Sequence, residues 1–331
     1  MFGLVAAGLA LIVAFSFQWL PRHASHEAGR INFLFWFVTI ICIAIFALVV
    51  AVIVYSVLKF RVAPDDDTDG PPIHGHTGLE VVWTAIPAIL VIAIGIISAV
   101  ILGRDDAAGK NPLNVDVIAQ QFAWSFKYPD HGGITSAELQ LPKGRSVLLH
   151  LTTRDVIHSF WVPEFSQKQD AVPGITTTLH ITPDKLGTYP VICTELCGLG
   201  HALMRSAVHV MTKNDFKAWL DNQGSAAASG NPAQAGKAVF TANGCGSCHT
   251  LRDAGVTAKI GPDLDKLPAE AQRAGKPLAD FVKESIVDPN KYVEKGYPAN
   301  VMPPSFGTSL SSSQLSSLVQ YLISASKGGG A

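Results

Sequence analysis

The sequence predicts a multidomain membrane protein in which a two-helix transmembrane hairpin precedes an all-β sandwich and an all-α domain. Three observations carry this prediction: two long uncharged apolar runs, a stretch of short β-like runs separated by turn residues, and a helix-rich C-terminal part. Charged residues make up 15% of the chain, whereas soluble proteins have about 25%. The formal net charge of -1 excludes a basic nucleic-acid binder, and the apolar composition disfavours a wholly soluble enzyme.

The N-terminal part carries the membrane prediction. Residues 31–58 and 81–102 contain no Asp, Glu, Lys, Arg or His, and each run exceeds the roughly 18 to 20 apolar residues needed to span a bilayer. A buried core helix is the alternative, but two such runs disfavour it. We therefore expect a transmembrane hairpin within residues 25–110. Residues 1–24 contain another apolar segment, which is either a signal sequence or an extra anchor.

Short apolar runs rich in Val, Ile and Thr fill the next part of the chain, residues 111–222. Three of them span residues 146–152, 175–181 and 205–211, and turn sequences such as Asp130-His131-Gly132-Gly133 separate the runs. This spacing is typical of an antiparallel β-sandwich or barrel. A helix is expected to follow, with Asn214 as its N-cap.

Beyond this helix, residues 223–231 are rich in Gly, Ser and Ala and predict a flexible linker. The remaining residues, 232–331, are expected to form a separate helical domain, with helices over residues 235–242 and 313–324. Four of the five cysteines fall in two close pairs, one in the β-rich part and one in this domain. Pairs at such short spacing usually hold a metal or a cofactor.

The pair in the helical domain lies in the motif Cys245-Gly-Ser-Cys248-His249. In a Cys-x-x-Cys-His motif the two thiols bond to haem vinyl groups and the histidine is the proximal iron ligand. A thioredoxin-like pair does not require the histidine, and a zinc site would need a second ligand pair, whereas no Cys or His follows His249. Met302 alone among the methionines lies beyond the motif, so it is the candidate sixth ligand, and His/Met ligation favours electron transfer.

The other pair lies in the motif Cys193-Thr-Glu195-Leu-Cys197-Gly-Leu-Gly-His201-Ala-Leu-Met204. Soft sulfur ligands together with imidazole select copper or zinc. A structural zinc site has no use for Met204, and a mononuclear blue-copper site needs only one thiol. Two thiols and a methionine favour two copper ions, while zinc or a Cys193–Cys197 disulfide remains the alternative.

This segment resembles, at every ligand position, the binuclear copper (CuA) loop of cytochrome c oxidase subunit II. The resemblance covers most of residues 25–212 and implies a cupredoxin-like fold with two copper ions. In that family both thiolates bridge the coppers, each copper takes one histidine, and the methionine and the glutamate carbonyl are further ligands. Cys193, Cys197, His201, Met204 and Glu195 match these positions.

The family takes its second histidine from an earlier part of the chain. His150, His158, His180 and His209 all have suitable spacing, but three of them lie inside strand-like runs, where a lone histidine is more often structural. His158 opens the sequence His-Ser-Phe-Trp-Val-Pro after Asp155-Val-Ile, which is similar to the family's first-ligand motif. The resemblance therefore assigns the second histidine to His158.

Other positions match family features outside the copper ligands. Glu80, in Leu-Glu-Val-Val-Trp-Thr-Ala-Ile-Pro, corresponds to a glutamate near the entrance of a proton path in the partner subunit, although an acidic residue also simply favours a helix N-terminus. The Glu195 side chain corresponds to a ligand of a magnesium ion shared with subunit I. Phe122 stands where mitochondrial members carry a tryptophan for electron entry. An electron path or a subunit I interface is implied for Phe122, Trp124, Lys168 and Asp170.

The C-terminal domain resembles a small class I cytochrome c. The resemblance rests on Ala235-Gly-Lys-Ala-Val-Phe, the haem motif, Gly261-Pro-Asp-Leu and Val301-Met-Pro-Pro. In that family the proline that matches Pro262 accepts a hydrogen bond from the axial histidine through its carbonyl. The combination of membrane hairpin, CuA domain and fused cytochrome c resembles subunit II of the caa3-type oxidases.

This resemblance implies an electron-entry subunit that passes electrons from haem c to CuA and on to subunit I, for reduction of O2 to water coupled to proton translocation. It implies subunits I and III and a cytochrome c or membrane-bound donor as partners, in a bacterial plasma membrane, with both redox domains extracytoplasmic. The predicted spans contain no histidine, so the chain alone lacks the O2-reducing site. The alternatives are the CuA subunit of a nitric oxide reductase and a membrane-tethered copper and haem binding module.

Overall fold

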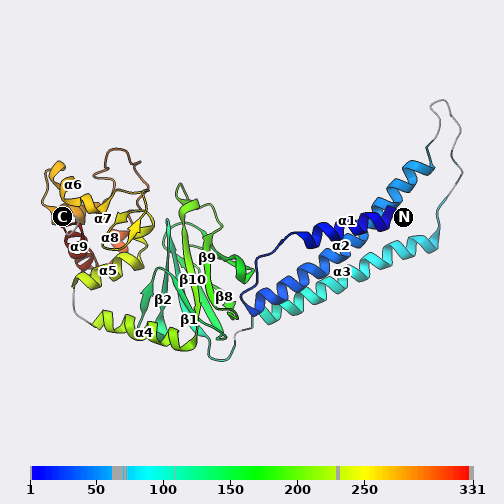
Figure 1. Ribbon diagram of the computed structural model, residues 1–331, viewed down its shortest axis with the longest axis horizontal. Helices are drawn as coiled ribbons and strands as arrows, with labels where there is room; N and C mark the ends of the chain where they lie inside the picture. Colours follow the sequence, from blue (N-terminus) through cyan, green and yellow to red (C-terminus); the bar gives the residue numbers. More distant parts are fainter. Residues whose placement is uncertain are drawn as a thin grey trace. The chain divides into compact units, whose positions relative to one another are not determined.

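The computed structural model describes residues 2–61, 70, 72, 74–107, 109–228 and 232–327. The chain divides into two compact units, one formed by residues 1–23 and 27–107 and the other by residues 24–26 and 108–331. Figure 1 shows that the first unit is helical, whereas the second contains β-sheets followed by short helices. This order of elements confirms the predicted fold class.

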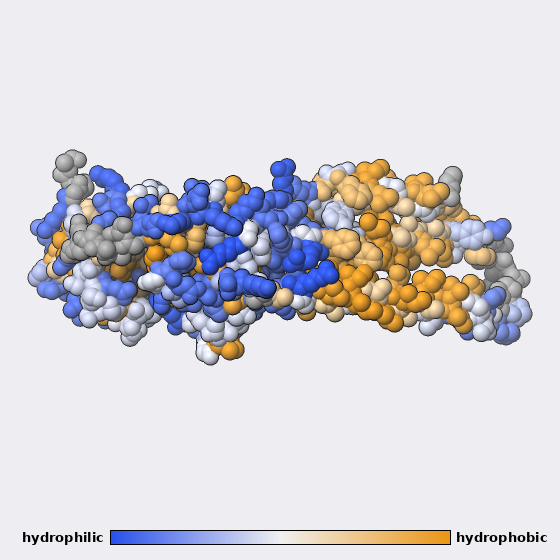
Figure 2. All heavy atoms as spheres, turned by 90° about the horizontal axis from the view of Figure 1, so that it is seen from below, coloured by the Kyte–Doolittle hydropathy of each residue, from blue (hydrophilic) through white to orange (hydrophobic). Residues whose placement is uncertain are grey.

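The first unit contains three helices, α1 (Phe2–Ser16), α2 (His26–Lys59) and α3 (Thr77–Asp105). Helices α2 and α3 are long and apolar enough to cross a membrane, in agreement with the predicted hairpin. Their hydrophobic side chains are largely exposed, and Figure 2 shows mostly apolar residues over this unit. Such a surface suits contact with lipid or with partner helices.

Helix α1 packs against α2, because the rings of Phe15 and Trp36 stack with their centroids 5.1 Å apart. Helix α1 has 15 residues and so spans about 22 Å, less than the roughly 30 Å of a bilayer core. Helices α2 and α3 are joined by an ion pair between Arg30 Nε and Asp105 Oδ1, 2.5 Å apart. Whether α1 is a signal sequence or an extra anchor stays a prediction.

The β-rich part of the second unit is a sandwich of two five-stranded sheets (Figure 1). One sheet has the order β3-β2-β1-β5-β8 and the other the order β4-β10-β9-β6-β7. The strand bounds are β1 (Leu113–Gln120), β2 (Ala123–Tyr128), β3 (Ile134–Ser136), β4 (Leu139–Pro142), β5 (Val147–Thr153), β6 (His158–Val162), β7 (Gln167–Ala171), β8 (Thr177–Ile181), β9 (Gly187–Cys193) and β10 (Arg205–Met211).

The sandwich is not wholly antiparallel, unlike the sequence-based expectation. Strand β1 pairs with β5 in parallel, and β4 pairs with β10 in parallel. Parallel neighbours need a long connection, because the chain must return to the same end of the sheet before the second strand begins. Between β1 and β5 this connection contains β2 to β4. Run lengths predict strands, but they do not predict which strands become neighbours.

The core of the sandwich follows from the alternation of side chains along each strand. In β1, Leu113, Val115 and Val117 are fully buried, while the residues between them are partly exposed. Strand β5 repeats the pattern with Val147 and Leu149. This period of two places one face of each strand in the core and fixes the register from which the loops of the sandwich project.

Helix α4 (Lys213–Ala228) follows the sandwich and differs from the prediction at both ends. Asn214 is not its N-cap, because the Thr212 hydroxyl accepts a hydrogen bond from the Asp215 N–H at 3.2 Å and so caps the helix two residues earlier. The helix also continues through Ala228 into the predicted linker, since alanine favours helix. Only residues 229–231 of that linker lie outside the described residues.

The C-terminal part consists of five α-helices among the described residues, with β11 (Thr250–Leu251) and β12 (Val256–Thr257) as a short hairpin. The first and last helices cross closely, because a Cβ added at Gly236 would lie 2.0 Å from the carbonyl oxygen of Ser317. This crossing needs glycine. The helices are α5 (Pro232–Ala242), α6 (Leu267–Arg273), α7 (Leu278–Val287), α8 (Phe306–Ser309) and α9 (Ser312–Lys327).

A charged contact reinforces this crossing and gives a pH-dependent stability. Asp253 Oδ2 accepts hydrogen bonds from the Tyr321 hydroxyl at 2.7 Å and from Lys237 Nζ at 3.2 Å, and these lower the pKa of Asp253 below 3.8. A lowered folded-state pKa stabilises the fold above the unfolded value, and this stability is lost as pH falls through the folded value. We expect the thermal midpoint to fall more steeply below about pH 4 in the wild type than in Asp253→Asn. Equal slopes would contradict this assignment.

Candidate metal and haem sites

Two paired strands bring the first cluster of site residues together. His158 opens β6 and Cys193 ends β9, and these strands pair antiparallel with Phe160 opposite Cys193. The loop after β9 continues through the helical turn His201–Leu203 to Met204, whose carbonyl accepts a hydrogen bond from the Cys193 N–H at 3.2 Å. The loop therefore returns to the point where it began.

Sulfur and imidazole atoms gather at this end of the sandwich. The Sγ atoms of Cys193 and Cys197 are 3.9 Å apart, and both cysteines are free. Each faces one imidazole: His158 Nδ1 lies 3.9 Å from Cys193 Sγ, and His201 Nδ1 lies 3.6 Å from Cys197 Sγ. Met204 Sδ is 3.8 Å from Cys197 Sγ. All predicted side-chain ligands thus meet in one cluster.

The backbone of the loop adds an oxygen to the cluster. The Glu195 carbonyl lies 3.3 Å from Cys193 Sγ and accepts its hydrogen bond, while the Glu195 side chain is exposed. His158 and Met204 are fully buried, and Cys193 and Cys197 are nearly so. His201 is partly exposed. The cluster therefore has a buried side and an accessible side.

The two thiols differ in acidity. Burial alone would raise the pKa of Cys193, but hydrogen bonding to His158 and to the Glu195 and Ser159 backbone outweighs it and lowers the pKa to about 7. Burial and the neighbouring Cys193 raise the pKa of Cys197 to about 12. The buried pair thus holds one thiolate readily and resists a second negative charge, which a bound cation would neutralise.

This donor set fits two copper ions. Two thiol sulfurs, two imidazole nitrogens, a thioether and a carbonyl exceed the four ligands of a structural zinc site. Thiolate, thioether and imidazole are the ligands that copper prefers. Each imidazole nitrogen faces a different thiol, so two metal ions held by this cluster would have one histidine each.

The other three histidines considered for this role lie elsewhere. His150 Nε2 is 3.4 Å from Asn114 Oδ1, and His209 pairs with Glu138 at 2.8 Å. His180 lies on β8 in the opposite sheet. The structure therefore distinguishes His158 by its contact with Cys193, which the spacing of histidines along the sequence could not do.

Two aromatic residues flank the cluster. The Phe122 ring lies against the copper-motif backbone, because a Cβ added at Gly200 would be 2.4 Å from that ring and one added at Gly198 would be 3.1 Å from it. Trp124 is buried and meets the His158 ring edge-on, with centroids 6.2 Å apart. Both predicted electron-path residues thus contact the cluster or its loop.

The remaining predicted positions lie outside the cluster. Lys168 Nζ sits over the Trp161 ring, 4.9 Å from its centroid, and Asp170 lies on the edge strand β7. Glu80 lies in the first turn of α3, in the first unit. Within the part of the chain that the structure describes, none of these three residues belongs to the metal-ligand cluster.

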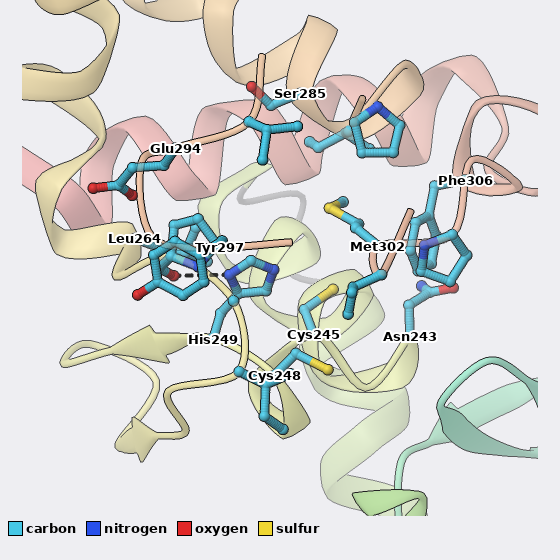
Figure 3. Close-up of a pocket in the computed structure, with 18 of the residues that line it drawn as sticks. Asn243, Cys245, Cys248, His249, Leu264, Ser285, Glu294, Tyr297, Met302 and Phe306 are labelled. Atoms are coloured by element: carbon cyan, nitrogen blue, oxygen red, sulfur yellow. Dashed lines mark hydrogen bonds between the residues drawn. The ribbon is translucent and has the colours of Figure 1, made fainter. Parts of the chain in front are cut away.

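The second predicted site is a cavity formed mainly by the C-terminal helical part, with residues 120–123 of the β-sandwich also in its lining. Figure 3 shows the sulfur atoms of Cys245, Cys248 and Met302 and the His249 ring around this cavity. Among the described residues its apolar lining comes from several helices and includes Phe240, Leu264, Phe281, Phe306, Leu318 and Leu322. An apolar cavity with a histidine and a methionine pointing into it matches the requirements of a six-coordinate haem c.

The axial histidine is oriented by the backbone. His249 Nδ1 donates a hydrogen bond to the Pro262 carbonyl at 2.8 Å, which leaves the Nε2 lone pair free for iron. Burial lowers the pKa of His249, so the ring stays neutral. Burial and Cys248 raise the pKa of Cys245 to about 12, so this side chain remains a thiol until it reacts.

Gly261 makes room for this histidine. A Cβ at this position would lie 2.5 Å from His249 Cε1, so Gly261→Ala must displace the ring or its Pro262 hydrogen bond. We expect a loss of about 1–3 kcal/mol in the free energy of unfolding, the usual cost of overpacking, and a smaller fraction of chains with covalent haem. Denaturant unfolding and haem staining measure these, and unchanged values for both would contradict the proposed fit.

Sequence reasoning missed one contributor to the first cluster. Gln121, in the turn between β1 and β2, donates from its side-chain Nε2 to the Cys197 carbonyl at 2.5 Å. Its only signal in the sequence is its place beside Phe122, because polar turn residues are common and the contact joins positions far apart in the chain.

Fold and sites together define a membrane-anchored electron-transfer protein with a cupredoxin-like domain and a cytochrome c domain. Three family models match the chain: the transmembrane domain of cytochrome c oxidase subunit II over residues 13–101, its periplasmic domain over residues 134–211, and cytochrome c over residues 233–326. The chain belongs to the cytochrome c oxidase subunit II family and carries a C-terminal cytochrome c domain. The match to the periplasmic domain implies copper binding in the β-sandwich, and the match to cytochrome c implies haem c binding in the C-terminal domain.

Relatives named cytochrome c oxidase subunit 2 cover most of the chain. The protein from Thermostichus vulcanus is 37% identical over 66% of this chain and 82% of its own length. That from Bacillus subtilis is 30% identical over 81% of this chain and 80% of its own. The solved periplasmic domain of subunit II from Bradyrhizobium japonicum is 28% identical, covers 36% of this chain and 98% of its own, and has a TM-score of 0.35.

Proposed function

We propose that this chain is the electron-entry subunit of a haem-copper oxygen reductase, which reduces O2 to water and translocates protons. The C-terminal domain accepts electrons from a cytochrome c or a membrane-bound donor, and the β-sandwich delivers them to subunit I. The observation that carries the proposal is the presence, in one chain, of two closed sulfur and imidazole sites, each completed by a methionine. Such closed sites suit electron transfer and leave no position for O2.

The proposed ligand sets follow from the geometry. Two copper ions are held by the side chains of His158, Cys193, Cys197, His201 and Met204 and by the Glu195 carbonyl. One haem c would be held covalently by Cys245 and Cys248, and His249 and Met302 would bind its iron, with Pro262 orienting His249. When bound, both groups supply one-electron oxidation and reduction with little change of geometry.

The chain's own residues prepare these sites. His158 presents Nδ1 to the copper side because its Nε2 is hydrogen-bonded to Asp155 at 2.8 Å, and His249 presents Nε2 because its Nδ1 is held by Pro262. Burial of His158 and Cys193 excludes water from one side of the cluster. Phe122 and Trp124 lie where electrons enter or leave the copper side.

Membership of the subunit II family supports a proposal for the assembly. We place the chain in a bacterial plasma membrane, with subunits I and III as partners and both redox domains on the extracytoplasmic side. The domains are residues 25–110, 111–222 and 232–331, preceded by a signal sequence or anchor within residues 1–24. The last two are connected through residues 223–231, of which the part up to Ala228 belongs to helix α4. Lys168 and Asp170 contact subunit I, the Glu195 side chain holds a shared magnesium ion, and Glu80 stands near a proton-path entrance.

Purification of the full chain with its membrane partners tests the function. Oxygen consumption that depends on this chain, with an external one-electron donor, is the expected result. Nitric oxide reduction in place of oxygen consumption would make it the CuA subunit of a nitric oxide reductase. The absence of any catalytic partner would leave only a copper and haem binding module and would contradict the proposal.

A further inference from the structure

We propose that Gln121 and Asp155 act together as positioning residues for the copper site: they form a hydrogen-bonded arm from the Cys197 carbonyl to the His158 ring. The inference rests on the proposed copper site and deepens it, because neither residue is a ligand. The arm joins three segments that are far apart in the chain, namely the β1–β2 turn, the loop before β6 and the loop after β9.

Gln121 forms the centre of the arm through two separate groups. Its backbone N–H donates to Asp155 Oδ2 at 2.7 Å, and its side-chain Nε2 donates to the Cys197 carbonyl at 2.5 Å. Only the side-chain bond depends on residue 121 being glutamine. Almost any residue offers a backbone N–H donor, whereas few offer a side-chain amide that reaches the Cys197 carbonyl. A residue without a side-chain donor would leave the Cys197 carbonyl without this partner.

Cys197 needs such a support because it lies outside the strand ladders. Cys193 is held in β9 opposite Phe160, whereas Cys197 follows the end of that strand and precedes the turn His201–Leu203. Beside the Gln121 contact, the Phe122 ring lies against the backbone at Gly198 and Gly200. The β1–β2 turn thus holds the distal part of the copper loop by one hydrogen bond and one packing contact.

Asp155 completes the arm on the histidine side. Its carboxylate accepts hydrogen bonds from His158 Nε2 at 2.8 Å, from the Val156 N–H at 2.8 Å and from the Thr153 hydroxyl at 3.2 Å, besides the one from Gln121. These donors hold the carboxylate in one orientation. Because His158 Nε2 is occupied, only Nδ1 can face Cys193 and a metal ion.

The two residues act in distinguishable ways. The carboxylate of Asp155 makes the imidazole of His158 a stronger electron donor, which stabilises the more oxidised state of a bound metal. Gln121 carries no charge, so its contribution is to hold the Cys197 loop in place. A purely structural role for Asp155 would change stability without a directed change in the redox potential of the copper site.

The test uses the full chain in detergent with Asp155→Asn, Gln121→Leu and a matched control. Glu138→Gln is the control, because it also removes a carboxylate that pairs with a histidine in the same domain. Glu138 pairs with His209 at 2.8 Å, and His209 lies outside the cluster, five residues beyond Met204. Copper binding (the number of ions bound and their affinity), copper EPR spectrum and midpoint potential are measured for each. Covalent haem content and thermal midpoint verify that each variant is folded.

We expect Asp155→Asn to keep two copper ions while its midpoint potential rises. A tenfold change in the redox equilibrium corresponds to about 59 mV for a one-electron couple. We expect Gln121→Leu to weaken copper affinity about 10- to 100-fold, the usual loss for an outer partner of a metal ligand, and to alter the EPR spectrum. Glu138→Gln should match the wild type in all three measurements.

The outcomes separate the arm from the site itself. If the wild-type chain does not hold two copper ions, the proposed function fails and the arm fails with it. If the wild type holds them and both arm variants match Glu138→Gln in affinity, spectrum and potential, the arm alone is wrong. A fall in potential for folded Asp155→Asn would likewise contradict the assigned role of the carboxylate.

Discussion

Replacement of Cys197 by serine is expected to reduce the copper content from two ions to at most one per chain and to abolish electron delivery. Cys197 Sγ faces Cys193 Sγ, His201 Nδ1 and Met204 Sδ within 3.9 Å. Cys193 Sγ also has three predicted ligand atoms within 3.9 Å, namely His158 Nδ1, the Glu195 carbonyl oxygen and Cys197 Sγ. A serine hydroxyl is a hard donor that does not replace a thiolate for copper.

The expected magnitude is large. Loss of even an outer partner of a metal ligand costs about 10- to 100-fold in affinity or activity, so loss of a bridging thiolate should lower oxygen consumption by the assembled complex more than about 100-fold. Metal analysis and oxygen electrode measurements check this.

Cys42→Ser provides the matched control for the cysteine replacement. Cys42 is a free cysteine in α2, outside both sites, and its replacement should leave copper content and oxygen consumption unchanged. A Cys197→Ser chain that retains two copper ions and normal turnover would show that the cluster does not bind metal as proposed.

The double replacement Cys245→Ala and Cys248→Ala is expected to remove covalent haem completely. Both thiols line the cavity into which His249 and Met302 point (Figure 3), and no other cysteine lies in the C-terminal domain. Without the thioether bonds, haem stays bound by axial ligation and packing alone and is released on denaturation. Haem staining of the denatured chain measures this, and oxygen consumption with an external donor should fall to background.

Two comparisons sharpen this prediction. The copper content of the double variant should remain two per chain, since Cys193 and Cys197 are untouched. Met302→Leu should keep its covalent haem but lower the reduction potential, because methionine ligation raises it. Covalent haem in the double variant would refute the attachment site.

Local patterns in the sequence predicted the elements that depend on neighbouring residues. The candidate membrane spans α2 and α3 were predicted from two long uncharged runs. Strand β10 was predicted from the apolar run 205–211. The ligands from Cys193 to Met204 were predictable because they lie within one short loop, so their spacing is visible in the sequence.

Features that depend on long-range neighbours were not predictable in this way. Spacing left four histidines open as the second imidazole. The family resemblance assigned this role to His158, and the pairing of β6 with β9 places His158 against Cys193. The parallel pairing of β1 with β5 and the contact of Gln121 with Cys197 join segments that are far apart in the chain. No local sequence pattern indicates that such segments are neighbours. The prediction ended α4 too early, because Gly and Ser after residue 222 suggested a linker. The alanines in the same run favour helix, and α4 continues through Ala228.

The central claim is that Cys193 and Cys197 together hold a pair of copper ions beside a covalent haem in the same chain. Metal analysis of the full-length chain, purified from membranes and normalised to protein, tests it most directly. The expected result is two copper atoms and one iron atom per chain. A single copper, zinc in its place, or cysteines 193 and 197 joined as a disulfide would contradict it.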